Sequence, residues 1–234
     1  MSNWWDDKIS VALPPIGPSP SDSDVFPFDK PCQVAYWLTG DEAKQLKTYR
    51  EGSTIPSIGL PSNGTAIGGP RVWSSETGTA GITRHHCGID LIKPVGTVIK
   101  SCSNGTILRF RHFYQGTYAL FIDCGDYIIN YGEVNKESLN EYGLKEGDSV
   151  SAGQPIAKVG ALSKSSMLHF EMYKPSLKGD FPTLKTSRKI CNQRWNFGDP
   201  VPSHLLDPTV YLTTLVNRIS GGKYDYILEN YQCR

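Results

Sequence analysis

The chain has 234 residues, of which 38% are hydrophobic and 20% are charged, and its formal net charge is +1. This composition excludes a globally disordered chain, because enough apolar residues are present to build a packed core. The near-neutral charge excludes the basic excess that is typical of nucleic-acid-binding surfaces, and no apolar run is long enough to span a membrane.

The first part of the chain is predicted to be an irregular arm. Residues 1–30 are rich in Pro, Ser and Asp, a composition that disfavours a regular strand ladder. A short helix is predicted for DEAKQLKTY, residues 41–49, with Thr39 or Asp41 as its cap. The N-terminus has no basic and then apolar leader. We therefore expect a protein that is made in the cytoplasm without a signal peptide.

From about residue 71 the sequence changes to short β-prone runs that are separated by turn signals. Strands are predicted within residues 96–102, 106–113, 117–124, 127–134, 149–160 and 167–173. This spacing favours an antiparallel β-sheet or sandwich over alternating strands and helices. A helix is predicted near the C-terminus, with Asp207 as its cap and Pro208 at its first position.

Six cysteines occur without any CxxC pair, which argues against a zinc finger or a thioredoxin motif. Disulfides and buried free thiols both remain open for this number of cysteines. Cys102 and Cys124 end strands that are predicted to be neighbours, so they are the candidate bridge. Cys87 points toward the core by alternation, and we interpret it as a small buried side chain or half of a disulfide, not as a metal ligand.

The stretch RHHCGIDL, residues 84–91, contains a candidate metal site. If it forms a strand, His86, Gly88 and Asp90 share one face. His86 and Asp90 would then flank a residue without a side chain, which leaves room for an ion between an imidazole and a carboxylate. Both groups are good zinc ligands. His85 faces the other way and is interpreted as a rim or surface residue.

The stretch MLHFE, residues 167–171, supplies a candidate third ligand. Met167, His169 and Glu171 alternate with core residues, so His169 points away from the core. Two imidazoles and one carboxylate with an open fourth position form a catalytic zinc set, whereas structural zinc sites are closed. On spacing alone, an ordinary hydrogen-bonded histidine stays an alternative. Glu171 is either a partner that supports His169 or an exposed strand residue.

Several motifs together resemble those of the lysostaphin/LytM-type zinc peptidases. HCGIDLIKPVGTVIKSCSNGTI resembles their first motif, GLKEGDSVSAGQPIAKVG their G-Q hairpin, LHFEMY their closing H-x-H-F-E strand and LDPTVYL their exit segment. These pieces follow the family order over roughly residues 71–212. The resemblance implies an antiparallel β core with a groove, of the duplicated hybrid motif type. It also implies one zinc ion, held by His86, Asp90 and His169.

Two positions depart from the family pattern. The family has histidines where this chain has Glu133 and Met167. A thioether has no useful basicity, so Met167 cannot transfer protons, but a carboxylate can. Glu133 shares a face with Tyr131 in a regular strand, and we expect it to point at the zinc and act as general base. Polarisation of the scissile carbonyl would then fall to the zinc, with help from Tyr131 or a backbone N–H.

The resemblance also divides the chain. Residues 69–215 form the predicted zinc peptidase-like β domain, residues 1–68 an N-terminal arm with a short helical extension, and residues 216–234 a C-terminal tail. The C-terminal helix is expected to pack on the sheet. The arm is expected to cover the groove, dock on a carrier or bind substrate, and the sequence leaves these alternatives open.

The activity that the resemblance implies is a zinc-dependent endopeptidase that hydrolyses peptide cross-links of bacterial peptidoglycan. The expected setting is an antibacterial toxin delivered by a secretion system, or a phage lysin, that acts in the periplasm or cell wall of a target bacterium. Besides peptidoglycan peptide, an immunity protein or a secretion carrier is a candidate partner. The main alternative is a catalytically inactive zinc-binding module that recognises cell-wall peptide or a protein partner. A metal-free structural β domain is a third reading.

Overall fold

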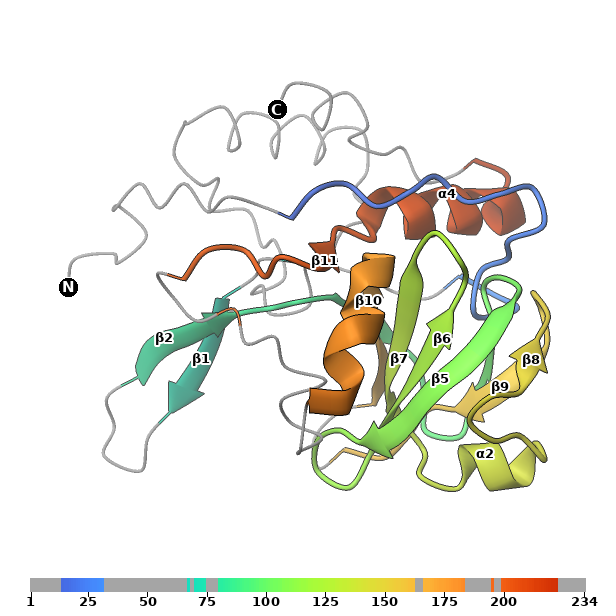
Figure 1. Cartoon of the computed structure of the whole chain (residues 1–234), viewed down its shortest axis with the longest axis horizontal. Helices are drawn as coiled ribbons and strands as arrows, with labels where there is room; N and C mark the ends of the chain where they lie inside the picture. The colour runs from blue at the N-terminus through green and yellow to red at the C-terminus, as the bar shows by residue number, and fades with distance from the viewer. Residues whose placement is uncertain are drawn as a thin grey trace.

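The computed structural model describes residues 14–31, 67, 70–74, 80–162, 166–183, 195 and 199–222. The helix predicted for residues 41–49 lies outside these residues, as does most of the loop after it. Within the described residues, the main element is a seven-stranded antiparallel sheet (Figure 1). The mainly β, antiparallel fold class that the spacing of turns predicts is therefore confirmed.

The sheet has the strand order β11-β10-β7-β6-β5-β8, and β3 also pairs with β10. Because β7 occupies one edge of β10, β3 and β11 lie end to end along its other edge. The strands are β3 (Ile89–Ile92), β5 (Gly105–His112), β6 (Tyr118–Asp123), β7 (Ile128–Val134), β8 (Ser149–Val150), β10 (Met167–Tyr173) and β11 (Leu205–Leu206).

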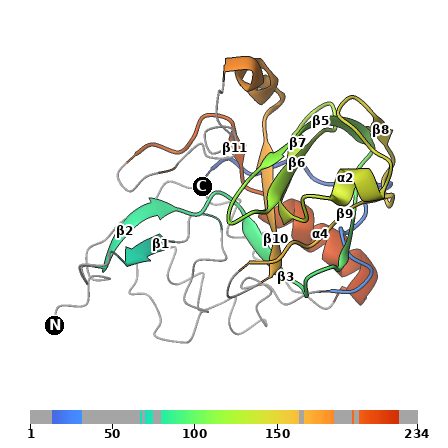
Figure 2. The same ribbon diagram turned by 90° about the horizontal axis from the view of Figure 1, so that it is seen from below.

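Two strand pairs and three helical segments complete the described fold. The pairs are β1 (Pro70–Ser74) with β2 (Ala80–His85), and β4 (Val98–Lys100) with β9 (Pro155–Lys158). The helical segments are α2 (Ser138–Glu141), the 3₁₀ helix η1 (Pro175–Thr183) and α4 (Thr209–Ser220). Figures 1 and 2 show the β1–β2 hairpin to one side of the large sheet. No described helix is long and apolar enough to cross a membrane.

Apolar side chains cover both faces of the sheet. On β10, Leu168, Phe170 and Met172 alternate toward the main core, as the sequence pattern predicts. On that face the sheet packs against residues of α4, namely Tyr211, Leu212, Leu215 and Val216. The opposite face carries a smaller apolar cluster that includes Phe121, Tyr173 and Trp195. His169 and Glu171 alternate toward this second face.

Residues 14–31, which the sequence assigns to the arm, run alongside α4 (Figure 1). Phe26 and Phe28 of this segment are buried in the main core. Asp24 is buried and accepts hydrogen bonds from the hydroxyls of Tyr127 and Tyr211, each at 3.0 Å. The guanidinium of Arg218, in α4, donates to the carbonyls of the same segment. Residues 14–31 and α4 therefore pack as part of one folded unit with the sheet.

Helix α4 begins one residue later than predicted. Pro208 occupies the N-cap position, and Thr209 is the first helical residue. The Asp207 carboxylate still serves the start of the helix, because it accepts the backbone N–H of Thr209 at 2.9 Å. The helix ends at Gly221, whose φ of 70° suits a residue without a side chain.

Cys102 and Cys124, the candidate bridge among the alternatives that the sequence left open, do not form a disulfide. Both residues are free thiols that pack in or against the main core. Burial raises the pKa of both thiols, that of Cys124 to about 12. A thiolate is the reactive form of cysteine, so these two side chains behave as small apolar groups. Cys87 is buried in the apolar cluster of the second face, and it lies in the break between β2 and β3, so strand alternation does not set its direction.

Candidate metal centre

Three of the predicted site residues meet in space. His86 Nε2 lies 2.9 Å from His169 Nδ1 and 3.2 Å from Asp90 Oδ1, and His169 Nδ1 lies 2.8 Å from the same oxygen. All three residues are buried, with 1%, 6% and 1% of His86, His169 and Asp90 exposed. The convergence of two imidazoles and one carboxylate that the sequence predicts is therefore present in the fold.

Strand pairing explains why residues so far apart in sequence meet. β3 pairs with β10 in a register that sets Asp90 opposite His169. His86 arrives differently from the prediction, because HHCGID is not one strand: β2 ends at His85 and β3 begins at Ile89. The break allows Gly88 to approach β10, where a Cβ would lie 2.4 Å from the Phe170 carbonyl oxygen and 3.0 Å from His169 Cε1. Only glycine fits this approach.

The donor set fits a divalent transition metal such as zinc. One ligand atom from each of His86, Asp90 and His169 lies within 4.8 Å of the other two. Imidazole nitrogen and carboxylate oxygen are both zinc ligands, and three protein ligands leave a coordination position open. Without a cation, the three contacts bring together groups that must share protons.

The electrostatics of the cluster favour positive charge. Burial by itself would lower the pKa of His169, but the carboxylates of Glu171 and Asp90 outweigh burial and raise it to about 10. Burial would likewise raise the pKa of Asp90, but His86 and His169 hold it well below its usual range. Both ring nitrogens of His169 face carboxylates, Nδ1 that of Asp90 and Nε2 that of Glu171. The negative charge of these carboxylates would equally favour a cation among the three candidate ligands.

A second layer of polar residues stands behind His169. Its Nε2 lies 2.8 Å from Glu171 Oε1, so Glu171 is the supporting partner that the sequence left as one of two alternatives. Glu171 Oε2 accepts hydrogen bonds from Asn130 Nδ2 at 2.5 Å and from the Tyr173 hydroxyl at 2.7 Å. Asn130 and Tyr173 are not predicted by the sequence patterns described above. Two features of the sequence could have indicated them. Asn130 is a polar residue inside the apolar strand IINYGEV, and Tyr173 lies four residues after His169 in an alternating strand, so it shares the face of His169.

Two neighbours restrict the His169 ring. The Phe113 ring lies 5.5 Å from it, centroid to centroid, with the planes tilted by 31°. Gly132 lies opposite His169 in the pairing of β7 with β10, and a Cβ on Gly132 would be 3.2 Å from His169 Cδ2.

Met167 starts β10 opposite Ile92 and is partly exposed. By alternation, Met167 shares the face of His169.

Glu133 lies one residue beyond Gly132, in a β-bulge. Tyr118 pairs with Val134 and Leu120 with Tyr131, so β7 has one residue more than β6 between these pairs. Glu133 has a φ of 61°, a conformation that residues with a side chain seldom adopt. Its carbonyl oxygen accepts the N–H of Gly160 at 2.9 Å, which helps to hold this backbone. Glu133 is 9% exposed and is not among the three residues of the ligand cluster.

The structure does not bring Tyr131 to the cluster, which corrects its predicted role. Tyr131 is fully buried in the main core, edge-to-face with Phe170. Its hydroxyl accepts the backbone N–H of Cys102 at 2.7 Å. Alternation along β7 places Tyr131 on the apolar face, so it cannot polarise a substrate carbonyl on the other. In a regular strand Glu133 would share that apolar face, and the bulge removes this carboxylate from the alternation.

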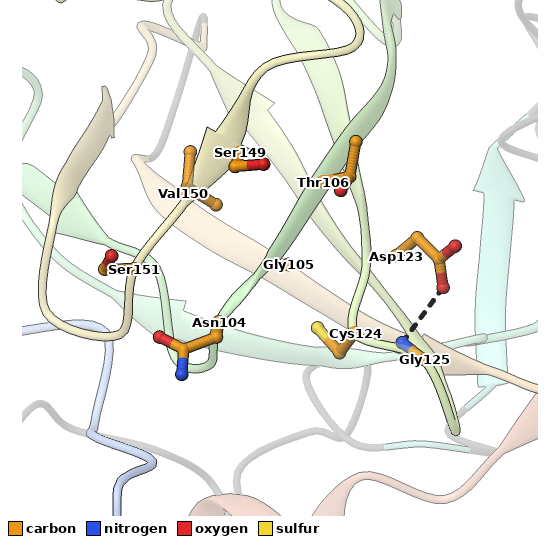
Figure 3. A pocket seen from close by; sticks show the side chains of 9 residues that line it. All are labelled: Asn104, Gly105, Thr106, Asp123, Cys124, Gly125, Ser149, Val150 and Ser151. Atoms are coloured by element: carbon orange, nitrogen blue, oxygen red, sulfur yellow. Dashed lines mark hydrogen bonds between the residues drawn. The ribbon is translucent and has the colours of Figure 1, made fainter.

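A shallow hollow at the start of β5 is separate from these residues (Figure 3). It is lined by polar and small side chains from the ends of β5, β6 and β8, including Asn104, Asp123 and Ser151. The Asp123 carboxylate accepts the N–H of Gly125 at 3.0 Å and is thereby part of the turn. None of the candidate metal ligands lines this hollow, so it gives the metal cluster no substrate-binding surface.

One family model and several solved structures are similar to parts of this chain. The family model of peptidase family M23 matches residues 84–181. The chain is similar to the catalytic domain of the antimicrobial peptidase lysostaphin from Staphylococcus simulans, with 23% identity, a TM-score of 0.42 and coverage of 64% of this chain and 90% of that one. The chain is also similar to LytU, with 30% identity, a TM-score of 0.35 and coverage of 48% of this chain and 73% of that one. A third similar structure is a zinc-containing peptidase from Vibrio cholerae, with 21% identity, a TM-score of 0.39 and coverage of 64% of this chain but only 37% of that one. No curated protein matches the chain.

Proposed function

Because residues 84–181 match the model of peptidase family M23, a family of metallopeptidases, we propose that this protein is a zinc-dependent endopeptidase that hydrolyses the peptide cross-links of bacterial peptidoglycan. The observation that carries the proposal is the buried meeting of His86, Asp90 and His169, with each ligand atom within 4.8 Å of the others. When bound there, zinc supplies Lewis acidity, which polarises a carbonyl and makes a water molecule more acidic.

The ligand set suits that chemistry. His86 would bind through Nε2, His169 through Nδ1 and Asp90 through Oδ1, because these atoms face one another. Two neutral imidazoles and one carboxylate leave a divalent ion with a net positive charge, so it stays electrophilic. The set also leaves a position for substrate, in contrast to the closed four-ligand sets of structural zinc sites.

We assign the general base to Glu133. A carboxylate oxygen of Glu133 would take a proton from the attacking water and return it to the leaving amine. The position supports this role, because Glu133 follows Gly132, which packs against His169. The unusual backbone supports it too, since strained residues gather at functional sites and persist only where their surroundings hold them. With Tyr131 in the core, stabilisation of the charge on the scissile carbonyl falls to the metal or to a backbone N–H.

Substitution of Glu133 by glutamine tests the enzyme against the inactive zinc-binding module. We expect the variant to keep its zinc and to lose about 10²- to 10⁴-fold in cleavage rate, the usual contribution of a general base. The measurement is analysis of muropeptides released from purified peptidoglycan, with zinc content determined on the same samples. Glu137→Gln, at an exposed position in the turn after β7, is the matched control and should cleave like the wild type. Absence of cleavage by zinc-loaded wild-type protein would favour the inactive module.

We also propose that the enzyme acts outside the producing cell, as an antibacterial effector or lysin that reaches the periplasm or wall of a target bacterium. The supporting argument is the substrate class, since peptidoglycan lies outside the cytoplasmic membrane. Directed to the periplasm of a Gram-negative host, the wild type should lyse the culture, whereas His169→Ala should not. The same wild-type chain kept in the cytoplasm should be harmless. Equal toxicity in both compartments would contradict action on the wall. An immunity protein or a secretion carrier remains a candidate partner.

A further inference from the structure

We propose that Asn130 and Tyr173 are positioning residues which, through Glu171, hold His169 in the tautomer and orientation that bind the metal. The inference rests on the same site as the proposed function and deepens it, but metal binding alone tests it. Neither Asn130 nor Tyr173 takes part in the hydrolysis that we propose. Each donates a hydrogen bond to the carboxylate of Glu171, and Glu171 in turn contacts His169.

The network is short and buried. Glu171 is 1% exposed and lies between His169 on one oxygen and two donors on the other. The donors are Asn130 Nδ2 at 2.5 Å, from the neighbouring strand, and the Tyr173 hydroxyl at 2.7 Å, from the same strand. Asn130 pairs directly with Glu171 in the register of β7 with β10. Both strands therefore fix the carboxylate, and through it the imidazole.

The residue types in this network indicate that it orients the Glu171 carboxylate and, through it, the His169 ring. Asn130 is fully buried, and its Oδ1 has no hydrogen-bond partner in the described part of the chain. A buried acceptor without a partner costs about 1–3 kcal/mol. An apolar residue at this position of β7 would avoid that cost, but it could not donate to Glu171. What Asn130 has, and an apolar side chain lacks, is an N–H group that donates a hydrogen bond to the Glu171 carboxylate.

The consequence for His169 follows from proton placement. Glu171 can only accept, so His169 Nε2 carries a hydrogen, and the lone pair of the neutral ring lies on Nδ1. That is the nitrogen which faces His86 and Asp90. Phe113 and Gly132 already limit rotation of the ring. What the carboxylate adds is the tautomer and the basicity of the ligand, and outer partners of this kind typically change metal affinity by about 10- to 100-fold.

The experiment compares two tyrosines. Tyr173→Phe removes a buried hydroxyl that donates to Glu171, while Tyr127→Phe removes a buried hydroxyl that donates to Asp24 at 3.0 Å in the main core. Zinc affinity is measured by competition with a chromophoric chelator, and the visible absorption spectrum of cobalt-substituted protein reports ligand geometry. We expect Tyr173→Phe to weaken zinc binding about tenfold and to alter the cobalt spectrum. Tyr127→Phe should bind zinc within about twofold of the wild type and leave the spectrum unchanged.

A second pair of variants keeps the test decisive if Tyr173→Phe folds poorly. Asn130→Asp faces Glu171 with another carboxylate and should weaken zinc binding by about 100-fold, more than Asn130→Ala does. Wild-type affinity and an unchanged cobalt spectrum in Tyr173→Phe and Asn130→Ala would overturn the inference. So would equal losses in Tyr173→Phe and Tyr127→Phe, because these would report stability alone. Weaker metal binding in the network variants, with no cleavage even by the wild type, would uphold the inference and reject the proposed function.

Discussion

Replacement of His169 by alanine will abolish both metal binding and cleavage of peptidoglycan. His169 is the proposed ligand that connects the two halves of the site, since Nδ1 faces His86 and Asp90 while Nε2 contacts Glu171. Even an outer partner of a ligand is worth about 10- to 100-fold in metal affinity, so loss of the ligand itself should exceed 100-fold. Zinc in the purified protein should fall from about one ion per chain to a trace. Elemental analysis and a chelator titration measure this.

The control for that experiment is His112→Ala. His112 is exposed at the end of β5, and its ring lies 6.0 Å from that of Tyr118, so it lies outside the cluster. This variant should retain the zinc and the activity of the wild type. If His169→Ala and wild type carried the same amount of zinc, the metal would lie elsewhere. The meeting of the three side chains would then need an explanation in folding stability.

The second large effect is expected from Gly88→Ala, a change of one methyl group. The added Cβ would lie 2.4 Å from the Phe170 carbonyl oxygen and 2.9 Å from Glu171 Cγ, and the former is backbone that cannot move aside alone. Relief requires β3 to separate from β10, which displaces Asp90 from His169. Overpacking of this kind costs about 1–3 kcal/mol, and in a chain of this size that lowers the melting temperature by roughly 2–12 °C.

Gly88→Ala should therefore lose stability and zinc affinity together, measured by thermal unfolding with and without zinc. A ligand that binds only the folded state stabilises it, so the zinc-induced rise in melting temperature should shrink in the variant. Gly179→Ala is the matched control, because Gly179 lies exposed in η1 with nothing within 4 Å of an added Cβ. Wild-type stability and metal affinity in Gly88→Ala would show that the β3–β10 contact is looser than the structure indicates.

The strands and the principal ligands could be predicted because both depend on local pattern. On β10, apolar Leu168 and Phe170 alternate with His169 and Glu171, and a strand cannot put neighbours on the same face. Because Leu168 and Phe170 are buried in the core, His169 and Glu171 must point to the opposite face of the sheet. His86 and Asp90 could be named from residue type and from the resemblance of their motif. That Asp207 serves the start of α4 could be predicted for the same reason, although Pro208 is the N-cap residue, since the Asp207 carboxylate accepts the N–H of Thr209 only two residues on.

Tyr131, Glu133 and Asn130 show where local pattern fails. Tyr131 was assigned to the site on the assumption of a regular strand, but its ring packs in the main core. The bulge that interrupts the alternation at Glu133 arises from the pairing of β7 with β6, which the sequence of β7 alone does not reveal. Asn130 has meaning only beside Glu171 of the neighbouring strand. The choice between a Cys102–Cys124 bridge and free thiols stayed open for the same reason, because it required knowledge of how the strand ends lie in space.

The order of apolar and polar residues along the chain thus determined by itself that this protein is an antiparallel β protein with His169 and Asp90 directed away from its main core. Tertiary structure alone decided that β3 and β10 bring these two side chains into contact, and that a break between strands adds His86. It also decided that Glu171, Asn130 and Tyr173 stand behind the ligand. The physical reason is that alternation is a property of one strand, whereas register and bulges depend on the free energy of packing two strands together.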